Sequence, residues 1–108
     1  MKKVIMLACS AGMSTSLLVT KMLKSAEEGG IDAEIFAVSI SEVNKVLESK
    51  KIDVLLFGPQ LSYMKDDYSN KLSSKGIPVD TIDMKDYGLM KGEKVLDKAL
   101  QIIGGYND

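Results

Sequence analysis

The sequence contains no histidine, no arginine and no tryptophan, and Cys9 is the only cysteine in 108 residues. Without histidine, the chain cannot form a Ser-His-Asp or Cys-His catalytic site of its own, or a histidine-based metal site. Without arginine, it cannot hold a phosphate through a bidentate guanidinium fork. A single cysteine excludes an internal disulfide, a CxxC redox pair and a structural zinc site.

The sequence also has no marked excess of either charge, because fourteen lysines and fifteen acidic residues give a net charge of −1. With no basic run, the chain offers little to nucleic acid. Lys2 and Lys3 precede an apolar segment, Val4–Cys9, as in a signal peptide, but this segment is too short and lacks a cleavage site. No stretch approaches the ~20 apolar residues of a membrane helix. We therefore expect a cytoplasmic protein that neither inserts into the membrane nor binds nucleic acid.

The apolar content is 45%, which is enough for one core without disulfide or metal staples. No linker, repeat or low-complexity segment divides the chain, so residues 1–108 are predicted to form a single domain.

Short apolar runs predict four strands, at Val4–Ala8, Ala33–Val38, Val54–Phe57 and Pro78–Ile82. The first and third are continuously apolar, as expected of parallel strands that are covered on both faces. Pro78 fits the beginning of a strand, where its missing amide is tolerated.

Longer amphipathic runs predict helices between and after these strands. The first is expected from a cap at Ser14 or Thr15 to about Glu28, with a stop at Gly29-Gly30. Ser39 and Glu42 have capping-box spacing before a short second helix. A third helical face ends at Gly76, and a last helix is expected over Glu93–Ile103 before Gly104-Gly105. The expected inward residues of the first helix are Leu18, Val19, Met22, Leu23 and Ala26, and those of the third are Leu61, Met64, Tyr68 and Leu72.

Alternation of strands and helices predicts an α/β fold, with a parallel sheet and helices on both faces joined by right-handed crossovers. Ligands of such sheets bind beyond the carboxyl ends of the strands. The segments Cys9–Ser16 and Gly58–Gln60 follow the first and third strands, so both are expected at this edge.

Cys9 is the residue best suited to chemistry. The small residues that follow it let the backbone curl, and their amides together with a helix N-terminus form an anion site. The same field favours a thiolate, which can attack phosphorus to give a phosphocysteine held by those amides. The alternative is that Cys9 is simply a small buried hydrophobe at a strand end.

Low-molecular-weight protein phosphatases also carry such a cysteine, but in the pattern Cys-x5-Arg. Here the sixth residue after Cys9 is Thr15, and no arginine is available to clamp a transferring phosphoryl group. Fast hydrolysis of a phosphocysteine is therefore not expected, which suits a phosphoryl carrier better than a phosphatase.

The segment Cys9–Val19 resembles the phosphorylation loop of the IIB subunits of the lactose/cellobiose class in the bacterial phosphoenolpyruvate:sugar phosphotransferase system. Gly58–Met64 is similar to that family's second loop. Ile82-Asp83, Tyr87-Gly88 and Gly92 resemble its third. The similarity extends over essentially the whole chain.

This resemblance implies that Cys9 accepts a phosphoryl group from a phosphohistidine of a IIA subunit and passes it to a sugar bound by the membrane-embedded IIC subunit. Such a phosphotransferase needs no cofactor or metal of its own. The implied fold is a flavodoxin-like or low-molecular-weight phosphatase-like sandwich with strand order 2-1-3-4, and the implied sugar is a β-linked disaccharide such as cellobiose, with chitobiose or lactose next. The residues implied to cradle the phosphoryl group, chiefly through backbone amides, are Ser10, Ala11, Gly12, Met13, Ser14, Thr15 and Ser16.

Further residues near this edge admit two interpretations each. Gln60 could hydrogen-bond the Cys9 loop or a phosphate, or simply cap the helix that begins there. Met13 could meet partners or fill a gap. Tyr63 and Tyr87 could line the edge or pack in the core. Four acidic residues could supply an acid, although the first two are expected on a solvated helix face: Asp66, Asp67, Asp83 and Asp86.

The residues alone are also compatible with two other classes of protein. A flavodoxin-like module could hold a flavin phosphate on the loop from Ser10 to Thr15, although there is little aromatic surface to sandwich the ring. An arginine-free relative of low-molecular-weight phosphatases or arsenate reductases is the other. A phosphoacceptor-aspartate regulator is excluded, because the first and third strands end at Cys9 and Gly58 rather than at acidic residues.

Overall fold

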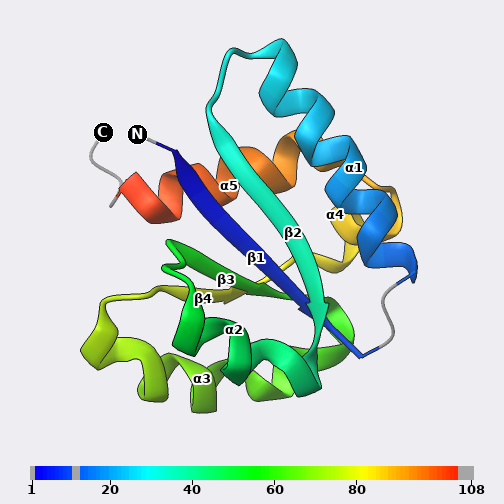
Figure 1. The fold of residues 1–108 in the computed structure, drawn as a ribbon. Helices are drawn as coiled ribbons and strands as arrows, with labels where there is room; N and C mark the ends of the chain where they lie inside the picture. The colour runs from blue at the N-terminus through cyan, green and yellow to red at the C-terminus, as the bar shows by residue number, and fades with distance from the viewer. Residues whose placement is uncertain (1, 11–12, 105–108) are drawn as a thin grey trace.

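The computed structural model describes residues 2–10 and 13–104 and contains one sheet of four parallel strands (Figure 1). The strands are β1 (Lys3–Cys9), β2 (Ala33–Ser39), β3 (Val54–Phe57) and β4 (Val79–Thr81). Their order is β2-β1-β3-β4, with every neighbouring pair parallel. The α/β class and the order 2-1-3-4 are thereby confirmed, and each predicted strand end agrees with the observed one to within one residue.

Helices cover both faces of the sheet, as predicted. On one face lie α1 (Met13–Glu28), α4 (Met84–Gly88) and α5 (Gly92–Gly104), and on the other α2 (Val43–Ser49) and α3 (Lys65–Leu72) (Figure 1). Three short 3-10 segments precede or follow these helices: η1 (Ile40–Glu42), η2 (Pro59–Met64) and η3 (Ser73–Lys75).

Strand β1 divides the core in two because its side chains alternate between the faces. Ile5 and Leu7 pack with α1 and α5, whereas Met6 and Ala8 pack with α2 and α3. All four are fully buried. This arrangement explains the uninterrupted apolar run, since neither face of a central parallel strand meets water.

Three local predictions were wrong. Ser14 and Thr15 do not cap α1, because the helix already begins at Met13 and both residues lie in its first turn. Leu23 is 42% exposed, since the buried stripe of α1 passes beside it. Ser39 makes no capping hydrogen bond, because its hydroxyl pairs with that of Ser41 at 2.9 Å.

The short helix α4 was not predicted, although its cap is visible in the sequence. The Asp83 carboxylate accepts hydrogen bonds from the amides of Lys85 and Asp86, at 3.0 and 3.2 Å. The helix ends with Lys91 donating to the Asp86 carbonyl at 2.9 Å and Met90 to the Tyr87 carbonyl at 3.1 Å. This is a Schellman motif in which Met90, at φ 55°, holds the left-handed position that usually belongs to glycine.

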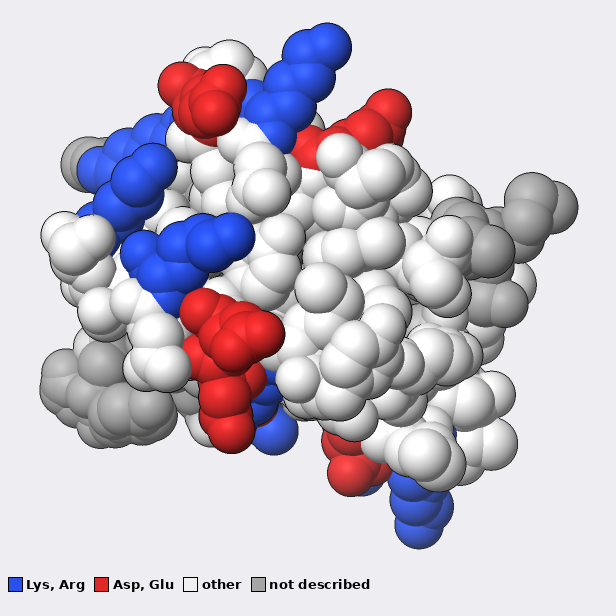
Figure 2. Space-filling model, turned by 90° about the horizontal axis from the view of Figure 1, so that it is seen from below, with Lys and Arg blue, Asp and Glu red and all other residues white. Residues whose placement is uncertain are grey.

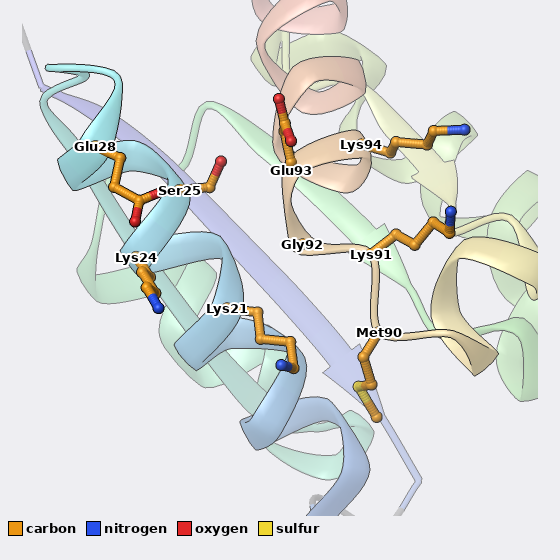
Figure 3. A pocket seen from close by; sticks show the side chains of 9 residues that line it. All are labelled: Lys21, Lys24, Ser25, Glu28, Met90, Lys91, Gly92, Glu93 and Lys94. Atoms are coloured by element: carbon orange, nitrogen blue, oxygen red, sulfur yellow. The ribbon is translucent and has the colours of Figure 1, made fainter.

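Gly92, the first residue of α5, lies against the backbone of α1 (Figure 3). A Cβ placed on Gly92 would be 2.7 Å from both the carbonyl carbon of Lys21 and the amide nitrogen of Met22. Because backbone atoms cannot give way as a flexible side chain can, only glycine allows α1 and α5 to pack this closely.

Replacing Gly92 with alanine should therefore force α1 and α5 apart and lower the free energy of unfolding by about 1–3 kcal/mol. Chemical denaturation monitored by circular dichroism would measure the change. Gly88→Ala is the matched control, because nothing lies within 4 Å of a Cβ at that helical position. Equal stability of the two variants would contradict the steric role of Gly92.

Asp80 on the edge strand β4 connects helices from opposite faces of the sheet. Its carboxylate lies 3.3 Å from Lys65 Nζ on α3 and 3.6 Å from Lys98 Nζ on α5. Burial alone raises the pKa of Asp80, but a hydrogen bond from the Thr81 amide and the charges of the two lysines together bring it below its ordinary value of 3.8.

Asp80→Asn should lower stability by about 0.5–1 kcal/mol at neutral pH, because the lysines are half-exposed and solvent screens them. Since the folded-state pKa lies below the unfolded one, this stabilisation is complete well above pH 3.8 and is lost as pH falls through the folded value. Urea unfolding of both proteins between pH 7 and pH 2.5 should show the stability difference closing at the acid end. A difference that stays constant over this range would rule out the ionised carboxylate as its source.

Candidate functional site

The ends of three strands bring the candidate site together. Strand pairing aligns Ala8 with Phe57 and Phe57 with Thr81, so β1, β3 and β4 end at the same edge. The segments that follow these strands leave from that edge, toward the lower right of the sheet in Figure 1. The prediction that the segments after the first and third strands begin at the same edge of the sheet is therefore confirmed.

Cys9 is the last residue of β1 and is only 3% exposed. Its Sγ lies 3.7 Å from the carbonyl oxygen of Val38 on β2, to which the thiol can donate a weak hydrogen bond. The thiol is thus held at the sheet edge by its neighbouring strand. Helix α1 begins only four residues later, at Met13, and the first four amides of an α-helix have no carbonyl partner within the helix.

The described residues of the first loop differ in solvent exposure. Ser10 lies in a bend and is exposed, and Ser16 is exposed on α1. Ala11 and Gly12 lie outside the described residues, as do the side chains of Met13 and Ser14, whose backbones form the start of α1.

Unlike Ser10 and Ser16, Thr15 has a side chain that is fully buried. Its Oγ1 lies 3.0 Å from the hydroxyl oxygen of Tyr87 on α4, across 72 residues of sequence. Tyr87 itself is only 9% exposed. The Thr15 hydroxyl is therefore engaged in the interior of the protein and does not face solvent.

The second loop meets the first at Gly58, which is buried. The Gly58 amide donates to the Ala8 carbonyl at 3.0 Å, continuing the pairing of β3 with β1. A Cβ on Gly58 would lie 3.1 Å from Gln60 Oε1 and 3.7 Å from Tyr87 Cε1. A side chain at Gly58 would therefore crowd the Gln60 amide, whereas Tyr87 would be at an ordinary van der Waals distance from it.

Other candidate residues have side chains that are exposed or already engaged. Tyr63 is 76% exposed on η2, and Asp66 and Asp67 are exposed on the first turn of α3, as expected of a solvated helix face. Asp83 is occupied as the cap of α4. Sequence reasoning left Tyr87 undecided between edge and core, and its contact with Thr15 was not foreseen, because no local pattern indicates a pairing over 72 residues.

The described part of the chain contains no group of three or more cysteine, aspartate or glutamate residues that could hold a metal ion. Among the same residues, no helix has the length and apolar character needed to cross a bilayer. On the face seen in Figure 2, charged side chains lie mainly on the left and along the upper and lower margins, and the described residues across the middle of its right half are uncharged.

A thiol at the end of a parallel strand, next to a helix N-terminus, has the parts of a phosphoryl acceptor. The free amides and the dipole of α1 favour an anion at this point. A thiolate there is a nucleophile, and a phosphoryl group attached to it would lie among the same amides.

Comparison with known proteins agrees with this chemistry. Residues 4–98 match the family described as "PTS system, Lactose/Cellobiose specific IIB subunit". The chain is 54% identical to the galactose-specific EIIB component of Lactococcus lactis subsp. cremoris (strain MG1363) and 53% identical to the cellobiose-specific EIIB component of L. lactis subsp. lactis (strain IL1403), each over 90% of this chain and 93% of the relative. It is 44% identical to the oligo-beta-mannoside-specific EIIB component of Bacillus subtilis (strain 168), over 95% of this chain and 97% of the relative.

Solved structures show the same fold. The solution structure of a cellobiose-specific phosphotransferase IIB component from Borrelia burgdorferi has a TM-score of 0.78 and 37% identity, covering 98% of this chain and 95% of the other. A lactose-specific IIB domain from Streptococcus pneumoniae also has a TM-score of 0.78, with full coverage of both chains. At 13% identity, this second likeness concerns the fold alone.

Proposed function

Because the chain belongs to the lactose/cellobiose-specific IIB family of the phosphoenolpyruvate:sugar phosphotransferase system, we propose that Cys9 is its phosphoryl-accepting residue. IIB components are phosphotransferases that work with IIA and IIC subunits in sugar uptake, and this function makes a covalent acceptor necessary. The observation that supports this assignment is the position of Cys9. It is the only thiol in the sequence and lies at the carboxyl end of β1, four residues before α1 begins.

In the first step, the donor is a phosphohistidine of the IIA subunit. The Cys9 thiolate attacks phosphorus, so that an S–P bond forms as the P–N bond breaks. The electron pair of the broken bond goes to the imidazole nitrogen of the donor. The amides of Ser10 to Ser16, together with the N-terminus of α1, stabilise the charge on the phosphoryl oxygens.

In the second step, the acceptor is a sugar hydroxyl held by the IIC subunit. The hydroxyl oxygen attacks phosphorus, an O–P bond forms, and the S–P electron pair returns to Cys9. The hydroxyl proton passes to a general base during this transfer. Each cycle therefore leaves the thiolate as it began.

The lack of arginine supports a carrier rather than a hydrolase. A phosphocysteine intended for a partner must outlast the time needed for that partner to bind, and the missing guanidinium removes the strongest aid to attack by water. Membership of the IIB family likewise does not favour the flavin-binding or phosphatase alternatives.

We further propose a cellobiose-type phosphotransferase that acts in the cytoplasm and meets the inner face of the membrane only through IIC. We propose cellobiose or a related β-linked disaccharide as the transported sugar, because the family of this chain is described as lactose/cellobiose specific. Relatives named for galactose and for cellobiose are nearly equally similar to this chain, at 54% and 53% identity, and neither name takes precedence on identity alone.

Phosphorylation of Cys9 can be tested by intact-protein mass spectrometry. The protein is incubated with phosphoenolpyruvate, enzyme I, HPr and a lactose/cellobiose-type IIA, beside a Cys9→Ser sample. We expect one phosphoryl adduct that requires IIA and is absent from Cys9→Ser. An adduct that persists in the variant would place the acceptor elsewhere, and no adduct with several IIA partners would refute the carrier function.

The sugar can be tested with the phosphorylated protein and membrane vesicles that contain a cellobiose-type IIC. We expect cellobiose to discharge the phosphocysteine and to appear as its phosphate ester, whereas lactose and galactose leave most of the adduct intact. Faster discharge by galactose than by cellobiose would overturn the proposed sugar class and leave the role of Cys9 untouched.

A further inference from the structure

We propose that Tyr87 is a positioning residue for phosphoryl transfer, which acts through Thr15 to hold the first turn of α1 against the end of β1. Tyr87 does not touch the reacting atoms in this arrangement. The inference rests on the proposed role of Cys9, and it concerns how the cradle around that residue keeps its geometry.

The contact between the two residues is a hydrogen bond between buried hydroxyl groups. The oxygen atoms are 3.0 Å apart, Thr15 is fully buried and Tyr87 is 9% exposed. Such a bond is difficult to replace, because a hydroxyl that loses its partner in the interior also has no water to bond to. The pair therefore favours one rotation of the first turn of α1.

Tyr87 can act as a fixed point because its own backbone is held at both ends of α4. Its amide donates to the Asp83 carbonyl at 2.9 Å, and its carbonyl accepts from Met90 in the turn that ends the helix. The ring also lies near the second loop, since a Cβ built on Gly58 would be 3.7 Å from Tyr87 Cε1. Tyr87 thus connects the segments that follow β1 and β4 through its bond to Thr15 and lies close to the segment that follows β3.

Thr15 is the third residue of α1, within the turn whose amides have no partner inside the helix. The direction of these amides decides how well they stabilise charge on a phosphoryl group, since hydrogen bonds weaken steeply with angle. Releasing Thr15 from Tyr87 would let the turn rotate. We expect a slower transfer step without loss of the acceptor residue.

The first measurement is single-turnover transfer from phosphorylated IIA to the intact protein, followed as a function of IIA concentration. For Tyr87→Phe we expect the maximal rate to fall about three- to tenfold, the loss that corresponds to one such hydrogen bond. The IIA concentration at half-maximal rate should stay as in the wild type. Thr15→Val should give the same pattern, and Thr15→Ser, which keeps a hydroxyl, should recover most of the rate.

Tyr68→Phe is the matched control. Tyr68 is a second buried tyrosine, 6% exposed, whose hydroxyl donates to Asn44 Oδ1 at 3.4 Å on the opposite face of the sheet. Its removal should also lower stability but leave the maximal transfer rate unchanged. All rates are compared well below the unfolding temperature of the least stable variant.

The double variant Tyr87→Phe/Thr15→Val tests whether the two residues act as one unit. We expect it to be no slower than either single variant, because the first substitution already breaks the contact.

Additive losses, an unchanged rate in Tyr87→Phe, or a Thr15→Ser protein as slow as Thr15→Val would each overturn the inference. If the wild type itself forms no adduct on Cys9, the proposed function fails and this inference fails with it. An adduct on wild-type Cys9 with no rate change in Tyr87→Phe refutes the inference alone.

Discussion

The close packing of α1 against the segment that follows β4 is the constraint on which the candidate site depends. That segment contacts α1 at two places, where Tyr87 hydrogen-bonds Thr15 in the first turn and where Gly92 lies against the backbone of Lys21 and Met22. The second contact sets how near the helix axes come, and the first sets the rotation of the helix end. Cys9 itself belongs to β1, so the relation between thiol and helix N-terminus is fixed by a part of the chain remote from both.

The sheet supplies the other half of this arrangement. The central strand β1 is buried on both faces and bonded on both edges, to β2 and to β3, so its end is a rigid support for the thiol. The bonding continues past the last strand residues, where Gly58 donates to the Ala8 carbonyl and Ile82 donates to the Phe57 carbonyl. The backbone at the carboxyl ends of β1, β3 and β4 is therefore already held in place by pairing between the strands.

Much of the fold could be predicted from the sequence, because its signals are local. The apolar runs of β1 and β3, the glycine stop at Gly76 with φ 70°, and the stripe that includes Leu61, Tyr68 and Leu72 each arise from periodicity or from one backbone conformation. The position of Cys9 at a strand edge follows from the same patterns. Helix α4 and the Thr15–Tyr87 contact could not be predicted in this way. A five-residue helix is too short for a periodic signal, and a pairing across 72 residues depends on the assembled sheet.

The absence of arginine and histidine has a consistent physical meaning in this site. A guanidinium would hold the phosphoryl oxygens strongly and assist attack by water, and an imidazole could activate that water. In the proposed site, a phosphocysteine is stabilised chiefly by backbone amides and a helix dipole, which do not accept or deliver a proton during the transfer. Such groups favour the bound phosphoryl group without promoting its hydrolysis. Their effect depends on direction, and for this reason the buried contact that orients the helix end matters to the chemistry at Cys9.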